Sequence, residues 1–417
     1  MKPALEGVRV IDLGMAWAGA TVTRLLADMG AQVIKVESRT RMDGRGGARP
    51  PAGFGLFPGG DPGERPWNRS GMFNERHRGK LGVTLELNTP AGNELFKKLA
   101  AVSDAVVENF SAGVMQRLAL GYHVLREVNP KIVMVSMPGH GSSGPERDYV
   151  SYGPTIEQLT GIASITGYRD GPPTNSNVHF ADPMSGVLAM GAVLSGILSA
   201  RRSGVGMHIE VAQRESTARL IGDVFMDYAM NQRVSARMGN RHPDMAPHGC
   251  YPCAGEDKWV TIAVSSDEEW RALCSVMARP DLARDERFTD GLSRHRHQDE
   301  LDQLVASWTR DQDHRVLMGR LQTAGVPAGA VMDAAELWED RHLRERSFFE
   351  EVDHADAGRM TLFSMAWAMS KSQPRLRSAA PTLGEHNNYV LRDILDMSEE
   401  DIQRLESEGV IGETPLV

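Results

Sequence analysis

Short apolar runs rich in β-branched residues alternate with helical stretches over the first 140 residues of the chain. The runs VRVIDL (8–13) and AQVIKVES (31–38) predict two strands, and WAGATVTRLLADMG between them predicts a helix. Strands at 81–87, 104–110 and 131–137 and a helix at 90–102 continue the alternation. Because strand–helix–strand units require parallel strands, we predict an open, doubly wound α/β domain whose ligands bind at the carboxyl ends of its strands.

The pattern changes after residue 183, where long helices replace the regular alternation. One clear strand, MHIEVA, occupies 207–212. Between about 230 and 330, the run WVTIAV (259–264) predicts a strand, and DEEWRALCSVMA and DQDHRVLMGRLQTAG predict helices. We predict a smaller α+β domain in this part of the chain. Ser398 is placed to cap a helix near the C-terminus.

Length and composition limit the class of protein. A chain of 417 residues is too long for one simple core, so we expect two domains or one large discontinuous domain. The net charge of −9 speaks against nucleic-acid or anionic-membrane partners, which need a basic surface. The N-terminal residues lack the apolar core of a signal peptide, and a content of three cysteines suits a reducing compartment. We therefore expect a cytoplasmic protein.

Two cysteines have a spacing that is used in metal and redox sites. Cys250 and Cys253 form a C-x-x-C, which occurs in redox pairs and as half of a zinc site. A zinc site needs two further ligands at matching spacing, and Cys274 is the one other cysteine of the chain. We therefore expect two ordinary thiols near a strand, and no metal site.

A long segment, residues 39–73, interrupts the early alternation. It is rich in glycine, proline and arginine, and a loop of this length is usually functional or disordered. Its large apolar side chains, together with Trp17, could line a roomy pocket or pack against a second subunit; they are Phe54, Phe57, Trp67, Met72 and Phe73.

The first predicted strand is followed by a degenerate dinucleotide-binding motif, DLGMAWAGA. That motif needs three glycines so that the backbone can approach a pyrophosphate and the helix can pack on the strand. Here Gly14 is followed by Ala16 and Ala18, and Gly19 is the one further glycine that is well placed. We do not expect a nicotinamide cofactor.

Asp182 stands immediately before eighteen uncharged residues, 183–200. It could cap a helix with Pro183 at the first helical position, border a membrane span, or react as a carboxylate. Glycines, serines and alanines make the segment only mildly apolar, and no second segment supports a span. We predict a buried helix whose small residues let another backbone approach. Local sequence alone favours a helix cap for Asp182.

The surrounding motifs resemble the class III CoA-transferases (CaiB/BaiF type), the family of formyl-CoA and carnitine CoA-transferases with a racemase branch. The resemblance runs nearly end to end and keeps the family's order. It rests on LEGVRVIDLG with AGATVTRLLADMGAQVIKVE, RGKLGVTLELNTPAG, VVENFSAGVMQRLALG, NPKIVMVSMPGHGSSGP, HGCYPCAGEDKWVTIAV, RFTDGLSRHRHQDEL, AGVPAGAV and APTLGEHNNYVL.

The resemblance implies an architecture. Residues 1–228 and 331–417 would form one large Rossmann-like CoA-binding domain from both chain ends, and 229–330 the small α+β domain. The helical stretch 214–232 would connect them. The monomer would be ring-like, and two rings would interlock as a homodimer.

The resemblance also implies the chemistry. Asp182 matches the family's nucleophile, which overrides the cap interpretation, although a helix N-terminus could serve both roles by stabilising the carboxylate. The substrates would be an acyl-CoA, succinyl-CoA among the donors, and a small carboxylic acid, with no tightly bound cofactor. Gly139, Gly141 and the turn 245–250 (MAPHGC) could supply N–H groups for a tetrahedral intermediate. The implied CoA contacts are Ala16, Ala18, Arg39, Asn109, Phe110, Val114, Arg117, Gly139 and His140; Pro138 replaces a lysine of formyl-CoA transferase.

Two alternatives stay open. The racemase branch deprotonates the carbon beside the thioester with an Asp and a His, but Tyr152 and Gly153 stand in the places of that His and its neighbouring Asp. Two-base racemisation would therefore lack its second proton carrier. The other alternative is a non-catalytic subunit of a heteromeric CoA-transferase, which the presence of Asp182 opposes.

Overall fold

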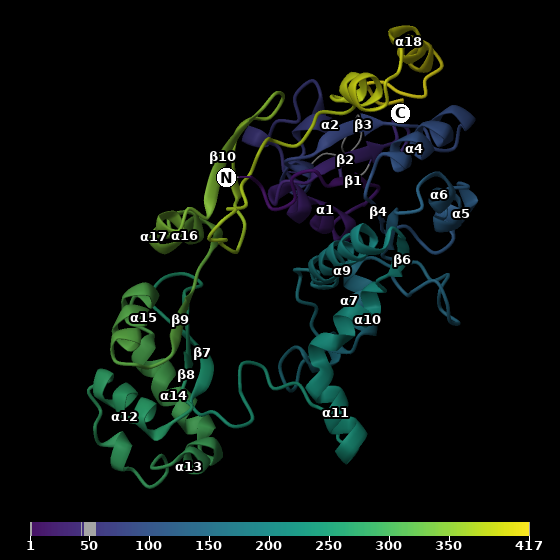
Figure 1. Cartoon of the computed structure of the whole chain (residues 1–417). Coiled ribbons are helices and arrows are strands. Elements are labelled where there is room, and N and C mark those ends of the chain that lie inside the picture. Colours follow the sequence, from purple (N-terminus) through teal and green to yellow (C-terminus); the bar gives the residue numbers. More distant parts are fainter. Residues whose placement is uncertain (1, 43, 46–55, 417) are drawn as a thin grey trace. The chain divides into compact units, whose positions relative to one another are not determined.

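A parallel sheet of six strands forms the centre of the larger of two compact units (Figure 1). The computed structural model describes residues 2–42, 44–45 and 56–416. The strand order is β3-β2-β1-β4-β5-β6, and every neighbouring pair is parallel. Because the order reverses between β1 and β4, their carboxyl ends flank the switch point at which such sheets bind ligands. The strands are β1 Arg9–Asp12, β2 Gln32–Glu37, β3 Leu81–Thr84, β4 Ala105–Glu108, β5 Val133–Ser136 and β6 Met207–Glu210.

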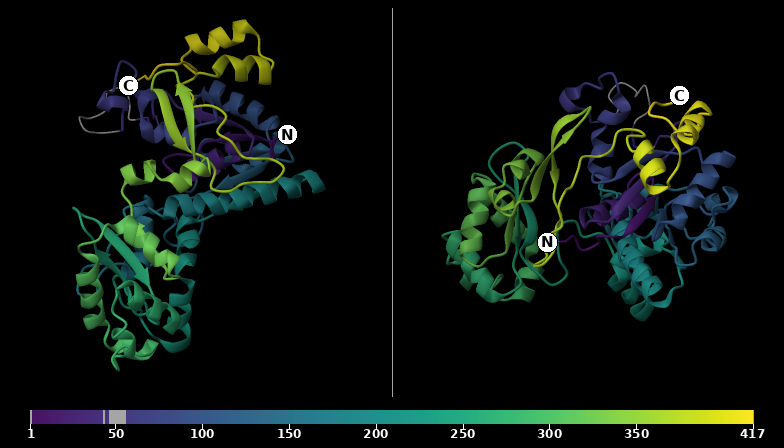
Figure 2. Two further views of the ribbon diagram at one scale, coloured as in Figure 1. Left: turned by 90° about the vertical axis from the view of Figure 1, so that its left-hand side faces the viewer. Right: turned by 45° about the horizontal axis from the view of Figure 1, so that its top comes forward.

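Helices cover both faces of this sheet, as the predicted doubly wound α/β fold requires. Successive strand residues point to opposite faces. Val10 and Val107 pack with α1 (Ala18–Asp28) and α9 (Ala181–Ser203), whereas the neighbouring Ile11 and Val106 pack on the other face. That second face is covered by α4 (Pro90–Ala101), α6 (Tyr122–Val128) and α18 (Glu399–Ser407). The C-terminal helix α18 therefore completes a core that the N-terminal strands begin (Figures 1 and 2).

The first unit comprises residues 1–163, 175–232 and 345–417. The predicted connecting helix 214–232 is divided, because one 3-10 turn, η2 (Arg219–Ile221), separates α10 (Gln213–Ala218) from α11 (Gly222–Asn231). The alternation pattern did not predict the antiparallel hairpin of β10 (Phe349–His354) and β11 (Gly358–Phe363). The remaining elements are η1 Pro58–Gly60, α2 Pro66–Arg69, α3 Gly71–His77, α5 Val114–Arg117, α7 Gly153–Leu159, α8 Ile162–Ile165 and η4 Tyr389–Ile394.

The second unit comprises residues 164–174 and 233–344. Compared with the expected small domain, 229–330, it also contains 164–174 and 331–344 but does not contain 229–232. A three-stranded antiparallel sheet, β7-β8-β9, packs one face on helices around Trp270 and Leu301. The elements of the second unit are β7 His248–Pro252, β8 Trp259–Ala263, α12 Asp267–Val276, η3 Leu282–Arg284, α13 Gly291–Arg296, α14 Gln298–Thr309, α15 His314–Thr323, β9 Ala328–Val331, α16 Ala334–Trp338 and α17 Arg341–Glu345.

Helix α9 is the long helix of small residues that the sequence predicts. Within the described part of the chain it is the one helix long and apolar enough to cross a membrane. It nevertheless packs against the sheet, since Val193 is fully buried and a Cβ at Gly196 would lie 2.7 Å from a methyl group of Val133. At Gly186 a Cβ would lie 2.7 Å from the Cβ of Thr21 and 2.9 Å from the carbonyl oxygen of Ala18. Small residues thus bring α9 directly onto α1.

The loop after β1 is anchored by a buried charged cluster. Asp12 accepts a hydrogen bond from the Gly14 backbone N–H (2.7 Å) and another from the Lys80 ammonium group (2.8 Å). The Lys35 ammonium group donates to the carbonyl oxygen of Gly14. Burial disfavours the charge on Asp12, yet Lys80 and Lys35 hold the pKa of its carboxyl below the usual value. The carboxylate and the two ammonium groups therefore depend on one another.

Replacing this carboxylate should destabilise the sheet unit. We expect Asp12→Asn to lower the free energy of unfolding by about 3–5 kcal/mol, because it leaves Lys80 and Lys35 buried without their counter-ion. Urea unfolding followed by circular dichroism measures the change. Asp393→Asn, which removes one partner of an exposed pair with Arg392, is the control and should leave the transition unchanged. Equal midpoints for both variants would show that the cluster does not stabilise the unit.

Candidate active site

The predicted CoA contacts Ala16, Ala18, Asn109 and Phe110 lie at the switch point of the sheet. The side chain of Asn109, which follows β4, accepts a hydrogen bond from the Met15 N–H (2.6 Å) and donates to the Met15 carbonyl oxygen (2.9 Å). Asn109 thereby joins the loops that follow β1 and β4. A Cβ on Gly19 would lie 2.5 Å from the Cα of Gly14. Glycine at these two positions lets the turn after β1 close.

Four further predicted contacts follow β4 and β5. Val114 is half-buried and Arg117 is exposed, both in α5. Gly139 lies against Ser151, because a Cβ on Gly139 would be 2.3 Å from the hydroxyl oxygen of Ser151. The ring of His140 packs edge-on against Tyr149, with 6.0 Å between centroids, and both of its nitrogens are buried without a hydrogen-bond partner among the described residues.

Arg39 has a different environment. Its side chain is buried, and its guanidinium group donates hydrogen bonds to the carbonyl oxygens of Ile411 (2.9 Å) and Thr414 (2.7 Å). The guanidinium group therefore holds the C-terminal segment against the loop after β2. That role is structural.

Asp182 lies in the first turn of α9 but does not cap it. The helix begins at Ala181, the capping position is Phe180, and no side chain caps the helix. Burial raises the pKa of the Asp182 carboxyl to about 6, although the charges of Arg76 and His179 act in the opposite direction. The cap interpretation of Asp182 is therefore wrong. Burial has the largest effect on the pKa of Asp182. With a pKa of about 6, the carboxyl is still mostly ionised at neutral pH.

The surroundings of Asp182 include a glycine with no room for a side chain. A Cβ on Gly153, the first residue of α7, would lie 2.4 Å from a carboxylate oxygen of Asp182 and 3.1 Å from the Cβ of His179. The neighbouring Tyr152 is 72% exposed. Any side chain at position 153 would displace Asp182 from its present position, so the glycine there gives the Asp182 carboxylate its space.

Arg76 is a charged neighbour of Asp182 that no sequence motif indicates. It lies in α3, where it stands in an ordinary charged stretch, NERHRGK. Its guanidinium carbon is 4.6 Å from the ring centroid of Trp17, and its Nη1 donates to the carbonyl oxygen of Ala16 (3.2 Å). Arg76 can therefore be recognised only from its contacts in the structure, not from the sequence.

The aromatic residues of the 39–73 segment do not share one environment. Phe54 lies outside the described residues. Phe73 is buried beneath the guanidinium group of Arg45, whose carbon is 3.6 Å from the ring centroid. Arg45 in turn forms a buried ion pair with Glu37 (2.7 Å). Phe73 therefore belongs to the core of the first unit.

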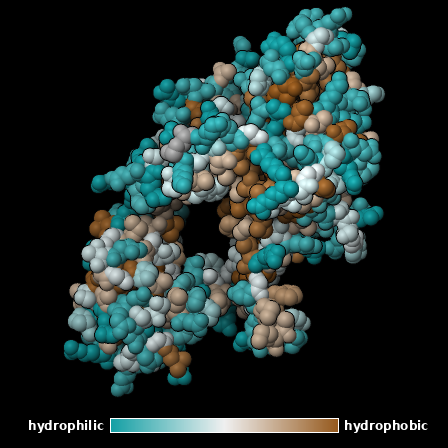
Figure 3. Space-filling view, in the orientation of Figure 1, coloured by the Kyte–Doolittle hydropathy of each residue, from teal (hydrophilic) through white to brown (hydrophobic). Residues whose placement is uncertain are grey.

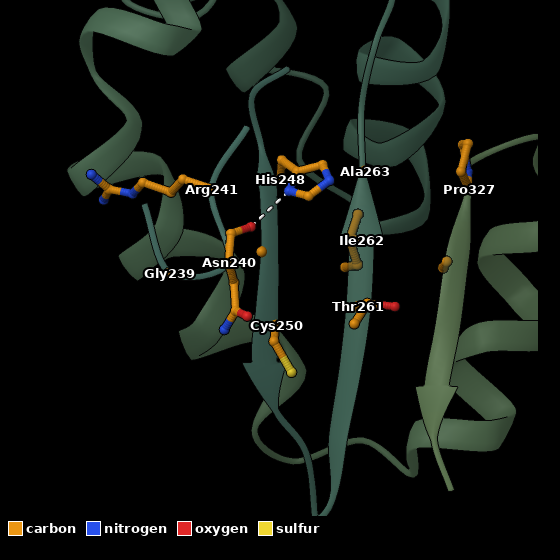
Figure 4. A pocket seen from close by; sticks show the side chains of 11 residues that line it. Gly239, Asn240, Arg241, His248, Cys250, Thr261, Ile262, Ala263 and Pro327 are labelled. Atoms are coloured by element: carbon orange, nitrogen blue, oxygen red, sulfur yellow. Dashed lines mark hydrogen bonds between the residues drawn. The ribbon is translucent and has the colours of Figure 1, made fainter. Parts of the chain in front are cut away.

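The predicted 245–250 turn belongs to the second unit, where it borders a pocket of about 430 Å³ (Figure 4). His248 lines the pocket, and its Nδ1 lies 2.7 Å from the carbonyl oxygen of Asn240. Cys250 also lines the pocket. Burial raises the pKa of the Cys250 thiol, and it raises the pKa of the Cys253 thiol to about 11. Both thiols are free and protonated, and no group of metal ligands gathers among the described residues.

Comparison with known proteins identifies the family to which this chain belongs. The model of CoA-transferase family III matches residues 5–387. The chain is 32% identical to succinyl-CoA–D-citramalate CoA-transferase of Chloroflexus aurantiacus, over 98% of both chains. It is also 32% identical to succinate–glutarate CoA-transferase of Agrobacterium fabrum, over 94% of this chain and 96% of that one. A CAIB/BAIF family protein from Brucella suis superimposes with a TM-score of 0.83 at 29% identity, covering 95% of this chain and all of the other.

The chain belongs to CoA-transferase family III, and it is a CoA-transferase. The resemblance inferred from its motifs is confirmed, as is the mixed α/β fold.

The contact between Gly153 and Asp182 can be tested by adding one methyl group. We expect Gly153→Ala to lower kcat by at least a hundredfold, because Asp182 must turn away, and small displacements of a reacting group are costly. The fold should survive, since the atom in the way is the end of a side chain. Transferase kinetics and thermal unfolding measure the two effects. Gly191→Ala, an exposed position with no atom within 4 Å of the added Cβ, is the control. Normal kcat in Gly153→Ala would contradict this geometry.

The raised pKa of Asp182 makes stability depend on pH. Folding favours the protonated carboxyl, so its ionisation opposes folding as the pH rises from about 4 through about 6. We expect Asp182→Asn to raise Tm by a few degrees at pH 8, because it removes a cost of at most about 3 kcal/mol that solvent screening reduces. The difference should fall to about half at pH 5, where the carboxyl of the unfolded chain is still ionised, and it should vanish only below about pH 4. Calorimetry of both proteins at the two pH values measures it, and a difference independent of pH would refute the assignment.

Proposed function

We propose that this protein transfers CoA from an acyl-CoA donor, succinyl-CoA in particular, to a carboxylic acid through an aspartyl-CoA thioester on Asp182. The observation that carries the proposal is a partly desolvated carboxylate in the first turn of α9, one turn before the contact of Gly186 with Ala18 and Thr21 of α1. Helix α1 follows β1, one of the two strands at the switch point where a doubly wound sheet binds its ligand. Curated relatives include enzymes named for succinyl-CoA with citramalate and for succinate with glutarate, which supports a dicarboxylic donor.

A carboxylate suits this reaction because it needs no general base. An oxygen of Asp182 attacks the thioester carbonyl, and the CoA thiolate leaves, so that a mixed anhydride forms. The thiolate then attacks the Asp182 carbonyl carbon, and the donor acid leaves as its carboxylate. The acceptor carboxylate attacks the resulting aspartyl thioester and expels the thiolate. Attack of the thiolate on the acceptor's own carbonyl carbon finally releases the new acyl-CoA and regenerates Asp182.

Each tetrahedral intermediate needs donors for its oxyanion. Gly139 and Gly141 are our candidates because they follow β5 at the carboxyl edge of the sheet, where glycine backbone leaves room for a ligand. We propose that CoA lies along the switch point, in contact with Ala16, Ala18, Asn109 and Phe110, and continues past Val114, Arg117 and His140. Arg39 is not included in this contact set, because its guanidinium group is engaged by Ile411 and Thr414.

We further propose a cytoplasmic homodimer of interlocked rings. Helix α11 supports this proposal because it carries large apolar side chains that nothing in the monomer covers. None of its residues is buried, and Phe225 and Met230 are 69% and 72% exposed. Hydrophobic side chains also reach the surface over α9 (Figure 3), where Val187 and Leu188 are exposed. Exposed apolar side chains gathered on helices are typical of surfaces that a partner covers.

A heteromeric enzyme is the second candidate, and one relative favours it. The chain is 31% identical, over 98% of both chains, to a protein named as the beta subunit of succinyl-CoA–L-malate CoA-transferase of Chloroflexus aurantiacus. If a second chain is needed, the purified protein alone will neither exchange CoA nor form the aspartyl thioester.

Covalent trapping tests the proposal. The purified protein is incubated with a panel of acyl-CoAs and then with hydroxylamine, and its peptides are analysed by mass spectrometry. We expect a hydroxamate on Asp182 with succinyl-CoA and none in Asp182→Asn. Unmodified Asp182 with every donor, together with exchange of the α-proton of an acyl-CoA into solvent, would favour the racemase instead. No reaction in either assay would favour the heteromer.

A further inference from the structure

A tight turn joins His179 to Asp182 at the start of α9. The Asp182 backbone N–H donates to the His179 carbonyl oxygen (3.1 Å), so residues 179–182 form one hydrogen-bonded turn. The backbone of His179 is left-handed, with a φ of 54°, and that of Asn177 has a φ of 58°. Left-handed residues other than glycine are uncommon, and they cluster at functional sites. The turn fixes the direction in which the His179 side chain leaves the backbone.

The side chains of His179 and Asp182 lie against the same glycine. A Cβ on Gly153 would be 2.4 Å from an Asp182 carboxylate oxygen and 3.1 Å from the Cβ of His179. Two atoms this close to a single point belong to neighbouring side chains. The hydrogen-bonded turn and the shared contact with Gly153 therefore place the His179 side chain next to the Asp182 carboxylate, within the first unit.

One nitrogen of the His179 ring has an unused capacity for hydrogen bonding. Its Nδ1 atom is buried and has no hydrogen-bond partner among the described residues. Buried polar atoms are nearly always paired, because an unpaired one is costly. An imidazole nitrogen that carries a proton is a donor, and the negative charge of Asp182 attracts that proton. Nδ1 is thus a donor for an acceptor that develops at Asp182.

The proposed reaction creates such an acceptor. When the CoA thiolate attacks the Asp182 carbonyl carbon of the mixed anhydride, a C–S bond forms and an electron pair moves onto the Asp182 oxygen. The carbon becomes tetrahedral, so this oxygen leaves the position that it has in the free carboxylate. Collapse of the intermediate then expels the donor acid as its carboxylate. No proton is transferred, and a neighbouring N–H group assists by donating a hydrogen bond to the oxyanion.

We propose that His179 is a catalytic residue whose Nδ1–H donates a hydrogen bond to the oxyanion that forms on Asp182 whenever its carbonyl carbon is attacked. The inference rests on the proposed aspartyl-CoA mechanism, and it adds a side-chain donor to the backbone candidates. Because the hydrogen bond is made to Asp182 itself, it serves every nucleophile that attacks the aspartyl thioester, whether charged or neutral. It is made in the transition state and not in the free enzyme, so its loss lowers kcat and leaves KM nearly unchanged.

Two substitutions separate the N–H donor from the backbone turn. His179→Gly removes the ring and accepts the left-handed conformation. His179→Asn also tolerates this conformation, and its amide nitrogen is bonded to Cγ, as Nδ1 of histidine is. The aspartyl-CoA forms of wild type and of both variants are prepared with succinyl-CoA at equilibrium and freed of excess donor. They are then discharged by succinate or by hydroxylamine.

We expect His179→Gly to slow discharge about 100-fold, by a similar factor with both nucleophiles, which is the usual effect of removing one oxyanion donor. The KM for succinyl-CoA should change little, and His179→Asn should recover most of the lost rate. Asn177→Gly is the matched control, because it changes the other left-handed residue of the same segment, whose side chain is exposed. This control should be discharged like wild type, and all three variants should keep the Tm of wild type.

The possible failures have different meanings. A loss confined to succinate would make His179 a ligand of the acid, and an unchanged rate would show that Nδ1 has no part in the reaction. Equal losses in His179→Asn and His179→Gly, or a comparable loss in Asn177→Gly, would assign the effect to the turn. Each of these results overturns the proposal. Failure of the mechanism itself is seen separately, since wild type would then form no thioester on Asp182 in the preparation step.

Discussion

Helix α9 and helix α1 touch at Gly186, where the backbone of one helix lies against Ala18 and Thr21 of the other. Any side chain at Gly186 would push the helices apart and carry Asp182, one turn earlier, away from the loop after β1. The same loop is held at Gly14 by hydrogen bonds to the side chains of Asp12 and Lys35, and Lys80 in turn donates to Asp12. The position of the carboxylate thus depends on a close backbone contact on one side and on a buried charged cluster on the other.

Strands β1 to β5 could be predicted because each is a short apolar run whose residues are mostly buried, as expected of parallel strands covered on both faces. Strand β6 at the edge alternates between half-buried and exposed residues. The hairpin β10–β11 could not be predicted in the same way, since most of its residues are only partly buried and alternate weakly. The division of 214–232 at Arg219–Ile221 has only a weak local signal, the single glycine at position 222 that follows the turn. Solvated elements leave a weaker pattern than buried ones.

Some residues of the candidate site could be predicted from the sequence, and others are recognised only from the structure. Asp182 and the CoA-binding loops lie within motifs, so resemblance indicates them, whereas Arg76 reaches the site from α3 through a contact with Trp17 that no spacing along the chain reveals. Gly153 illustrates the intermediate case. The sequence shows a glycine there, and the structure adds that a Cβ at this position would collide with the Asp182 carboxylate.

The environment of Asp182 balances two opposing requirements. A nucleophile that must not be replaced by water benefits from a desolvated site, yet desolvation raises the pKa of the carboxyl toward the range in which it is protonated. A nearby cation restores ionisation, but a tight ion pair would weaken the nucleophile. Arg76 supplies such a charge, and the Ala16 carbonyl oxygen and the Trp17 ring hold its guanidinium group in place. The charge of Arg76 then lowers the pKa of the Asp182 carboxyl against the effect of burial.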